Sequence, residues 1–240
     1  MKKYALIIVF AFVLGGCSSS YITPAGGVSV TQISDVSIEE LFKREPSSPF
    51  PARLAIVRIQ DKSYSTGTNS GYGSGAYTVV TARDIESEED FLALSKLKNV
   101  SAVAPLSRLL IPQNADNLKD LRMAAAKLKT DLLLVYSVDT AFNVEGTPLG
   151  PLSLISLGFI PNKKAFVSAT VSGALIDVRS GYIYGTTEAT EKESQLATIW
   201  STREAIDESR VISERKAFKS FLKKYEALWV EIERQYATKG

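Results

Sequence analysis

Two serine–lysine pairs have the spacing that catalysis by a serine–lysine dyad requires. Ser213 with Lys216, and Ser220 with Lys223, both satisfy S-x-x-K, in which a desolvated lysine activates the serine hydroxyl. Both pairs lie in a charged segment near the C-terminus, and the S-D-N and K-T-G motifs that accompany this arrangement in β-lactamases occur nowhere in the chain. We interpret the spacing as coincidence, and a Ser–Lys hydrolase is the least favoured of three functional hypotheses.

A glycine-rich stretch and several carboxylates are the other candidates for chemistry. Residues 71–75 read GYGSG, which matches neither the phosphate-binding motifs nor the G-x-S-x-G nucleophile elbow, so we expect a flexible or partner-contacting loop. The acidic pairs at 88–89 and at 191 and 193 are expected to be solvated. No D-x-D-x-D-G calcium loop occurs, and three aspartates at strand ends are expected to cap or turn the chain: Asp131, Asp139 and Asp177.

Composition excludes several functional classes. The 240 residues include no histidine and one cysteine, Cys17, so Ser-His-Asp and Cys-His catalysis and the commonest zinc ligands are missing. We therefore predict that the protein is not an enzyme, with no catalytic residue, no metal, no cofactor and no small-molecule substrate. If residues 1–16 are removed, two of the 28 basic residues are lost and 26 face 26 acids. This balance argues against binding to nucleic acid.

The first sixteen residues have the pattern of a secretory signal peptide. Lys2 and Lys3 precede the uncharged apolar run 4–14, and Gly15 and Gly16 supply a small-residue cleavage site. As an α-helix this run would be about 16 Å long, roughly half the hydrocarbon thickness of a bilayer. The run is therefore too short to serve as a transmembrane anchor.

The residues around the cysteine resemble the bacterial lipobox. Residues 14–17 read LGGC, and the resemblance implies cleavage between Gly16 and Cys17 and acylation of Cys17, with palmitate among its acyl chains. Two or more chains, each contributing about 0.8 kcal/mol per buried methylene, make a stable membrane anchor. Ser18, where inner-membrane lipoproteins have aspartate, resembles the outer-membrane sorting pattern. The implied location is the outer membrane, lipid-anchored and facing the periplasm.

Three regions follow from this reading of the chain. Residues 1–16 form the signal peptide, and residues 17–51 are rich in serine, glycine and proline, which predicts a lipidated N-terminus and flexible tether with one short helix at 37–43. Residues 52–240 form one periplasmic domain. Its apolar patterns predict strands over 53–59, 77–81, 100–106, 132–138, 165–176 and 182–190, and helices over 87–98, 117–129 and 202–236.

The order of these elements predicts the fold class. It implies an α/β sandwich (α+β), a mixed β-sheet with helices packed on one face and a long C-terminal helix. The run 132–138 is continuously apolar, as expected of a strand covered on both faces. The last helix carries an apolar stripe that we expect to pack on the sheet: Phe218, Phe221, Leu222, Tyr225, Leu228, Trp229 and Ile232.

Three segments resemble a known periplasmic domain. These are LSKLKNVSAVAP (94–105), AAAKLKTDLLLVYS (124–137) and SATVSGALIDVRSGYIYG (168–185). They are similar to the α/β domain shared by CsgG-type curli-secretion lipoproteins and the TolB amino-terminal domain. The resemblance covers most of residues 52–190, and residues 157–190 look more like the rhombotarget lipoproteins. It implies a role in assembly or export at the cell envelope.

The segment 147–162 is unusually apolar for a loop, with no charge between Glu145 and Lys163. Exposed apolar patches of this kind mark contact surfaces, so the segment is either an edge tucked into the core, a partner or self-association surface, or an insertion that touches the membrane. A pore is disfavoured, because membrane-crossing strands need roughly nine to eleven alternating residues each. The candidate partner surface is Leu152, Leu154, Ile155, Leu157 and Phe159.

Two hypotheses lead from these observations. The first is a non-enzymatic lipoprotein of the outer membrane whose periplasmic domain binds another envelope protein, or itself, during assembly or export. The alternative is an oligomeric subunit or accessory of an outer-membrane secretion channel. Size in detergent separates the two, because a ring elutes far above the chain mass of 26.1 kDa.

Overall fold

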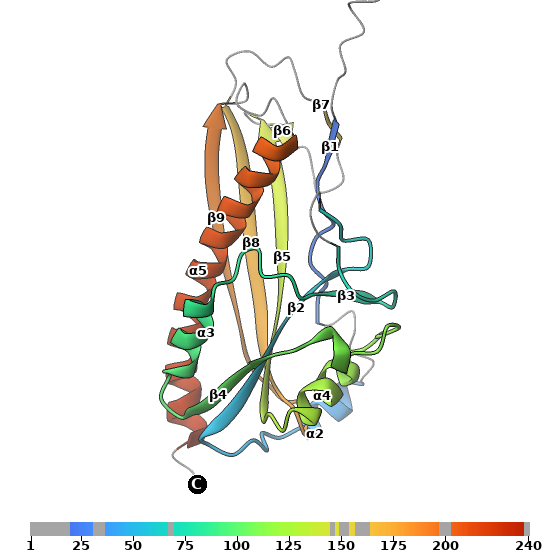
Figure 1. Cartoon of the computed structure of the whole chain (residues 1–240). Coiled ribbons are helices and arrows are strands. Elements are labelled where there is room, and N and C mark those ends of the chain that lie inside the picture. Colours follow the sequence, from blue (N-terminus) through green and yellow to red (C-terminus); the bar gives the residue numbers. More distant parts are fainter. Residues whose placement is uncertain are drawn as a thin grey trace, which may run out of the picture.

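A mixed β-sheet and a long C-terminal helix dominate the computed structural model (Figure 1), which describes residues 20–30, 37–66, 70–144, 147–148, 154–156, 164–196 and 203–237. The strands are β1 (Ser20–Ile22), β2 (Ala52–Asp61), β3 (Tyr77–Val80), β4 (Val100–Pro105), β5 (Leu132–Val144), β6 (Thr147–Pro148), β7 (Leu154–Ser156), β8 (Lys164–Asp177) and β9 (Ile183–Leu196). The helices are α2 (Ile38–Lys43), α3 (Glu88–Ser95), the 3-10 helix η1 (Arg108–Leu110), α4 (Leu118–Lys127) and α5 (Arg203–Tyr236).

The main sheet is built around β2 and β5. Its order is β3-β2-β5-β8-β9, with β4 also paired to β2 and β6 to β5. β2 pairs in parallel with β4 and β5 and antiparallel with β3, whereas β5, β8 and β9 form antiparallel pairs. β4 borders residues 52–56 of β2 and β3 borders residues 58–61, so the two strands share one edge of β2. The predicted α/β class, with its mixed sheet and long C-terminal helix, is confirmed.

The helices lie on both faces of the sheet, which corrects the expectation that they share one face. α3 and α5 pack on the face that carries Ile56 and Leu134. α4 packs through Leu121 on the opposite face, against Val57 and Leu133. The physical reason is that β2 and β5 are apolar on both sides, and each apolar side of such a strand must be covered.

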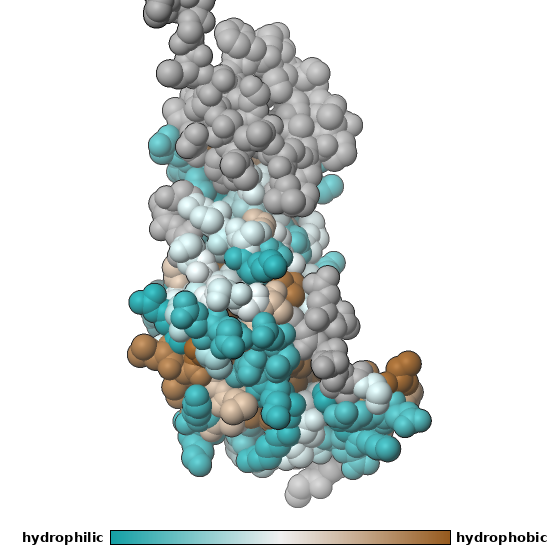
Figure 2. All heavy atoms as spheres, turned by 90° about the vertical axis from the view of Figure 1, so that its right-hand side faces the viewer, coloured by the Kyte–Doolittle hydropathy of each residue, from teal (hydrophilic) through white to brown (hydrophobic). Residues whose placement is uncertain are grey.

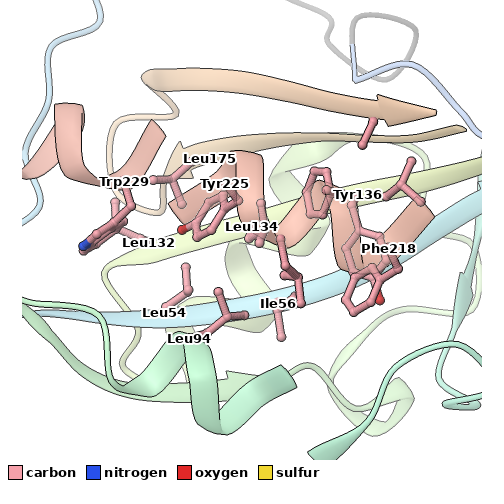
Figure 3. Packing of buried hydrophobic residues seen from close by; sticks show 14 of the residues in the cluster. Leu54, Ile56, Leu94, Leu132, Leu134, Tyr136, Leu175, Phe218, Tyr225 and Trp229 are labelled. Atoms are coloured by element: carbon pink, nitrogen blue, oxygen red, sulfur yellow. The ribbon is translucent and has the colours of Figure 1, made fainter. Parts of the chain in front are cut away.

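The larger core lies between α5 and the sheet. Phe218, Phe221, Tyr225 and Trp229 are buried, and consecutive rings lie 6.1, 6.4 and 6.4 Å apart between centroids. Figure 3 shows this helix facing apolar residues of β2, α3 and β5. Gly173 of β8 allows the close approach, because a Cβ there would lie 2.7 Å from the Phe221 ring. The predicted packing of the α5 stripe on the sheet is confirmed.

Asp177 organises the turn between β8 and β9, as predicted for an aspartate at a strand end. Its carboxylate accepts the backbone N–H groups of Arg179 at 2.8 Å and Ser180 at 2.9 Å, and that of Ser47 at 2.8 Å. Burial alone would raise the pKa of Asp177, but hydrogen bonds from Ser180, Ser47 and Ser48 together hold this pKa below its ordinary value. The carboxylate therefore stabilises the turn in its charged form.

Described residues of 17–51 on both sides of α2 are packed against the domain, which corrects their assignment to a flexible tether. Thr23 and Val28 are buried. The Gly27 N–H donates to Asp139 Oδ1 at 2.8 Å, and a Cβ at Gly27 would lie 2.5 Å from a side chain of β5. The glycines that suggested a linker are therefore needed for close contact between this segment and the sheet.

The residues just before β2 are also held in place. Ser47 and Ser48 hydroxyls donate to the Asp177 carboxylate at 2.9 and 2.8 Å. The Phe50 ring lies 6.0 Å from that of Trp229 between centroids. The folded body therefore includes residues on both sides of 31–36 and begins well before residue 52.

Candidate functional site

The predicted partner surface can be followed only along its backbone. Leu154 and Ile155 lie in β7, which pairs antiparallel with β1, with Tyr21 opposite Ile155 and Ile22 opposite Leu154. The other predicted site residues lie outside the described residues: Gly16, Cys17, Leu152, Leu157 and Phe159. Since β1 begins three residues after Cys17, β7 lies beside the chain that leads to the predicted lipidation site.

The serine–lysine pairs do not form dyads. Ser213 is buried and its hydroxyl donates to the Val167 carbonyl at 3.2 Å. Lys216 instead forms an ion pair with Glu193. Ser220 donates to a glutamate of β9 at 2.6 Å. These hydroxyls are occupied in packing α5 onto the sheet, which agrees with the interpretation of S-x-x-K as coincidence.

The glycine-rich stretch 71–75 is fastened to the loop before α4. The Ser74 N–H donates to the Gln113 carbonyl at 2.7 Å. A Cβ at Gly75 would lie 2.0 Å from the Ala115 carbonyl oxygen. The Ser74 N–H is therefore used within the fold, and Gly75 serves close backbone contact rather than anion binding.

A buried cluster of charged side chains is the most unusual polar feature, and the sequence did not predict it. Arg58 of β2 and Arg210 of α5 have side chains that are 1% and 0% exposed. Arg58 lies 2.9 Å from Asp84, 3.8 Å from Glu86 and 3.7 Å from Glu214, measured between nitrogen and oxygen atoms. Arg210 Nη1 donates to Glu214 Oε2 at 2.6 Å. We refer to these five residues as the ionic cluster.

The charges of the cluster depend on one another. Burial by itself lowers the pKa of Arg58, but Tyr64, Glu86, Glu214 and Asp84 outweigh it and raise this pKa above its ordinary value. The Arg210 pKa is raised in the same way, against burial, chiefly by Glu214. Both guanidinium groups are therefore held charged by the surrounding carboxylates.

Burial disfavours the charged form of Glu86. Burial raises the pKa of Glu86, and the neighbouring Arg58 only partly offsets this. The Tyr136 hydroxyl donates to Glu86 Oε1, and burial also raises the pKa of Tyr136. A buried carboxyl with a raised pKa is typical of active sites but also occurs in structural ion networks.

A small cavity lies beside the cluster. It has a volume of about 220 Å³ and lies where β3 and β4 diverge along β2, with Glu86 and Arg58 among its lining residues. Among the described residues, Glu86 Oε2 and Arg58 Nε have no hydrogen-bond partner, yet both atoms are shut off from solvent. Because Arg58 of β2 lies 3.7 Å from Glu214 of α5, we assign the cluster a structural role in joining α5 to β2.

A larger groove lies on the sheet face opposite α5. Its volume is about 720 Å³, and residues 27–30, α2 and strands β5, β8 and β9 line it. This volume falls within the range of ligand sites, but three of the charged groups that line it have partners inside the protein. Asp139 accepts from residue 27, Glu188 accepts from Ser172, and Arg44 donates to the carbonyl of Gly181.

Exposed apolar side chains gather near this groove, on a short helix. α2 buries none of its residues, and Ile38, Leu41 and Phe42 are 73%, 44% and 87% exposed. Figure 2 shows brown patches on both flanks of the lower end of this side of the molecule, bordered by teal. The i, i+3, i+4 spacing of the three residues was the sequence signal for this exposed apolar face.

Comparison with other proteins adds no identification. No family model matches the sequence. No curated protein matches it either. Within the described ranges, no group of three or more potential ligands is arranged to hold a metal ion. None of the helices in the part of the chain that the structure describes has both the length and the apolar character to cross a bilayer.

Proposed function

We propose that the protein is a non-enzymatic lipoprotein of the bacterial outer membrane, anchored through acylated Cys17, whose periplasmic body binds another envelope protein during assembly or export. The LGGC sequence after a short apolar leader carries the proposal of an anchor. The resemblance to CsgG-type and TolB amino-terminal domains, and to rhombotarget lipoproteins, supplies the envelope context and is part of the proposal.

The pairing of β1 with β7 supports a contact surface close to the anchor. Ser20 lies opposite Ser156 and Ile22 opposite Leu154, so β7, which is part of the apolar segment 147–162, pairs with a strand that begins three residues after Cys17. A partner that binds this segment would meet the protein at the membrane surface.

The disposition of reactive groups supports a non-enzymatic role. The most buried serine of the S-x-x-K motifs, Ser213, donates to a backbone carbonyl. The unpartnered atoms of the ionic cluster are closed to solvent. Among the described residues, the groups best suited to chemistry are therefore engaged in holding the fold together.

Photocross-linking in intact cells tests the binding proposal. A photoreactive amino acid at Leu154 or Ile155 is expected to capture one envelope protein reproducibly, and the same group at Leu109 serves as a control. Leu109 is 89% exposed and belongs to η1, where the neighbouring Leu110 carbonyl accepts from Lys127 of α4. Figure 1 shows α4 at the end of the molecule opposite to β7. Equal capture of the same proteins from all three positions would contradict a specific contact surface at β7.

The alternative function is an oligomeric subunit or accessory of a secretion channel. The exposed apolar face of α2 is the observation that favours self-association. Size-exclusion chromatography with light scattering in detergent tests it. A monomer supports the binding protein, whereas a ring of many copies of the 26.1 kDa chain supports the channel.

A further inference from the structure

The chain between the proposed anchor and the folded body is short. Ser20, where β1 begins, is the third residue after Cys17, with only Ser18 and Ser19 between them. Fully extended, three residues reach about 11 Å. The residues directly after β1 contact the folded body: Thr23 and Ala25 are buried, and the Gly26 carbonyl accepts from the Asp61 N–H at 3.0 Å.

This short connection starts at one end of an elongated body. Figure 1 shows β1 and β7 at the same end as β6, the last residues of β9 and the first turns of α5. α2, α4 and the last turn of α5 lie at the other end. α5 alone has 34 residues, a length of about 51 Å at 1.5 Å per residue, which is several times the reach of the connection.

We propose that the end of the body that carries β1 and β7 faces the phospholipid headgroups of the membrane, and that the end with α2 and α4 points away from them. This inference rests on the proposed function, because it requires an acylated Cys17. The uncharged run between Glu145 and Lys163, which contains β7, is the part of the sequence suited to that position, since apolar segments bind at the boundary between headgroups and acyl chains.

The orientation also separates two surfaces. The exposed apolar residues of α2 belong to the end that points into the periplasm, whereas β7 belongs to the membrane end. An envelope partner that binds at β7 must therefore approach along the bilayer.

Site-directed spin labelling of the mature lipoprotein tests the orientation. Acylation occupies the only native thiol, Cys17, so one introduced cysteine is the only labelling site. Ser194→Cys, Thr190→Cys and Thr186→Cys give a series of exposed positions on one face of β9. The series covers about 26 Å at roughly 3.3 Å per residue. Leu109→Cys, in η1 beside α4, is the reference.

Each labelled protein is placed in vesicles of phosphatidylethanolamine and phosphatidylglycerol with a nickel-chelating headgroup lipid. We expect nitroxide relaxation enhancement to fall from Ser194 to Thr190 to Thr186, and to be severalfold larger at Ser194 than at Leu109. A matched variant with ten glycine and serine residues inserted after Ser18 should flatten this gradient, because such a linker spans about 17 Å on average.

Four results would overturn the inference, and each is distinguishable. A reversed gradient would place the α4 end at the membrane, and a gradient that is flat without the inserted linker would mean that the body lies on its side. Dipolar broadening at Ser194 without nickel enhancement would mean that a second copy covers this end. Failure of the protein to bind vesicles, together with a Cys17 of unmodified mass, would remove the anchor and with it the proposed function.

Discussion

The two halves of α5 hold the same sheet by opposite chemistry. The N-terminal half packs through buried polar groups, among them Arg210, Ser213 and Glu214. The C-terminal half packs through aromatic rings from Phe218 to Trp229. The polar half depends on the direction and charge of individual contacts, whereas the apolar half depends on buried area and close packing.

The largest expected effect comes from removing the charge in β2 that pairs with the polar half of α5. Arg58→Ala leaves Glu86 and Glu214 buried without their partner, and loss of one member of a buried ion pair costs about 3–5 kcal/mol. Urea unfolding of the domain measures this free energy. Arg234→Ala, which removes an ion pair at the surface of the same helix, is the control and should cause no measurable change. A stability change at Arg58 as small as that of the control would show that the cluster does not join α5 to β2.

The apolar half is tested where Gly173 of β8 packs against Phe221 of α5. Gly173→Ala places a methyl group 2.7 Å from the Phe221 ring, and overpacking of this kind costs about 1–3 kcal/mol. Combining it with Phe221→Leu should recover part of this loss, because the smaller side chain makes room. If the two effects add without recovery, the loss at Gly173 does not arise from contact with Phe221.

Substitutions in α4, on the opposite face of the sheet, should lower the stability independently of substitutions at the α5 interface. Asn117 caps α4, with its side chain accepting from the Asp120 N–H at 3.2 Å, and Asn117→Ala should cost about 1 kcal/mol. The exposed neighbour Lys119→Ala is the control. Since α4 and α5 pack in separate apolar clusters on opposite faces of the sheet, the losses from Asn117→Ala and Arg58→Ala should add to within about 0.5 kcal/mol. A larger deviation would show that the two faces are coupled.

The smallest expected effect is a pH dependence from Glu86. Because burial raises the pKa of Glu86, the folded protein keeps its proton at pH values where the unfolded chain, near the ordinary value of 4.5, has released it. The unfolding free energy should therefore fall as pH rises from that value through the folded pKa. Glu86→Gln removes this contribution, so its stability relative to the original protein should increase over the same range. A difference that stays constant with pH would mean that Glu86 is ionised in the fold.

Local sequence patterns predicted the aromatic packing of α5 but not its polar contacts in the ionic cluster. The aromatic stripe of α5 was visible because its residues recur at helical spacing within one segment. The ionic cluster brings together Arg58, Asp84, Glu86, Arg210 and Glu214 from three separate segments. A charged residue on a helix normally faces solvent, so Arg210 and Glu214 gave no sign of burial.

The N-terminal region shows how composition can mislead. Glycine, serine and proline between 17 and 51 predicted a flexible tether, yet Gly27 and Ser47 serve as contact residues that donate to Asp139 and Asp177. Small and turn-forming residues occur both in linkers and in tightly packed segments. Here the segment is packed because Asp139 and Asp177, which are distant in the sequence, accept its backbone N–H groups. The Asp177 turn was predictable because its partners Arg179 and Ser180 are adjacent in sequence.

Intact mass spectrometry of the protein extracted from bacterial membranes tests the central claim most directly. We expect a chain that begins at Cys17 and carries the mass of a diacylglyceryl group and an amide-linked acyl chain. A chain that retains Met1, or a Cys17 with a free thiol, would contradict the lipid anchor and with it the proposed location of the protein.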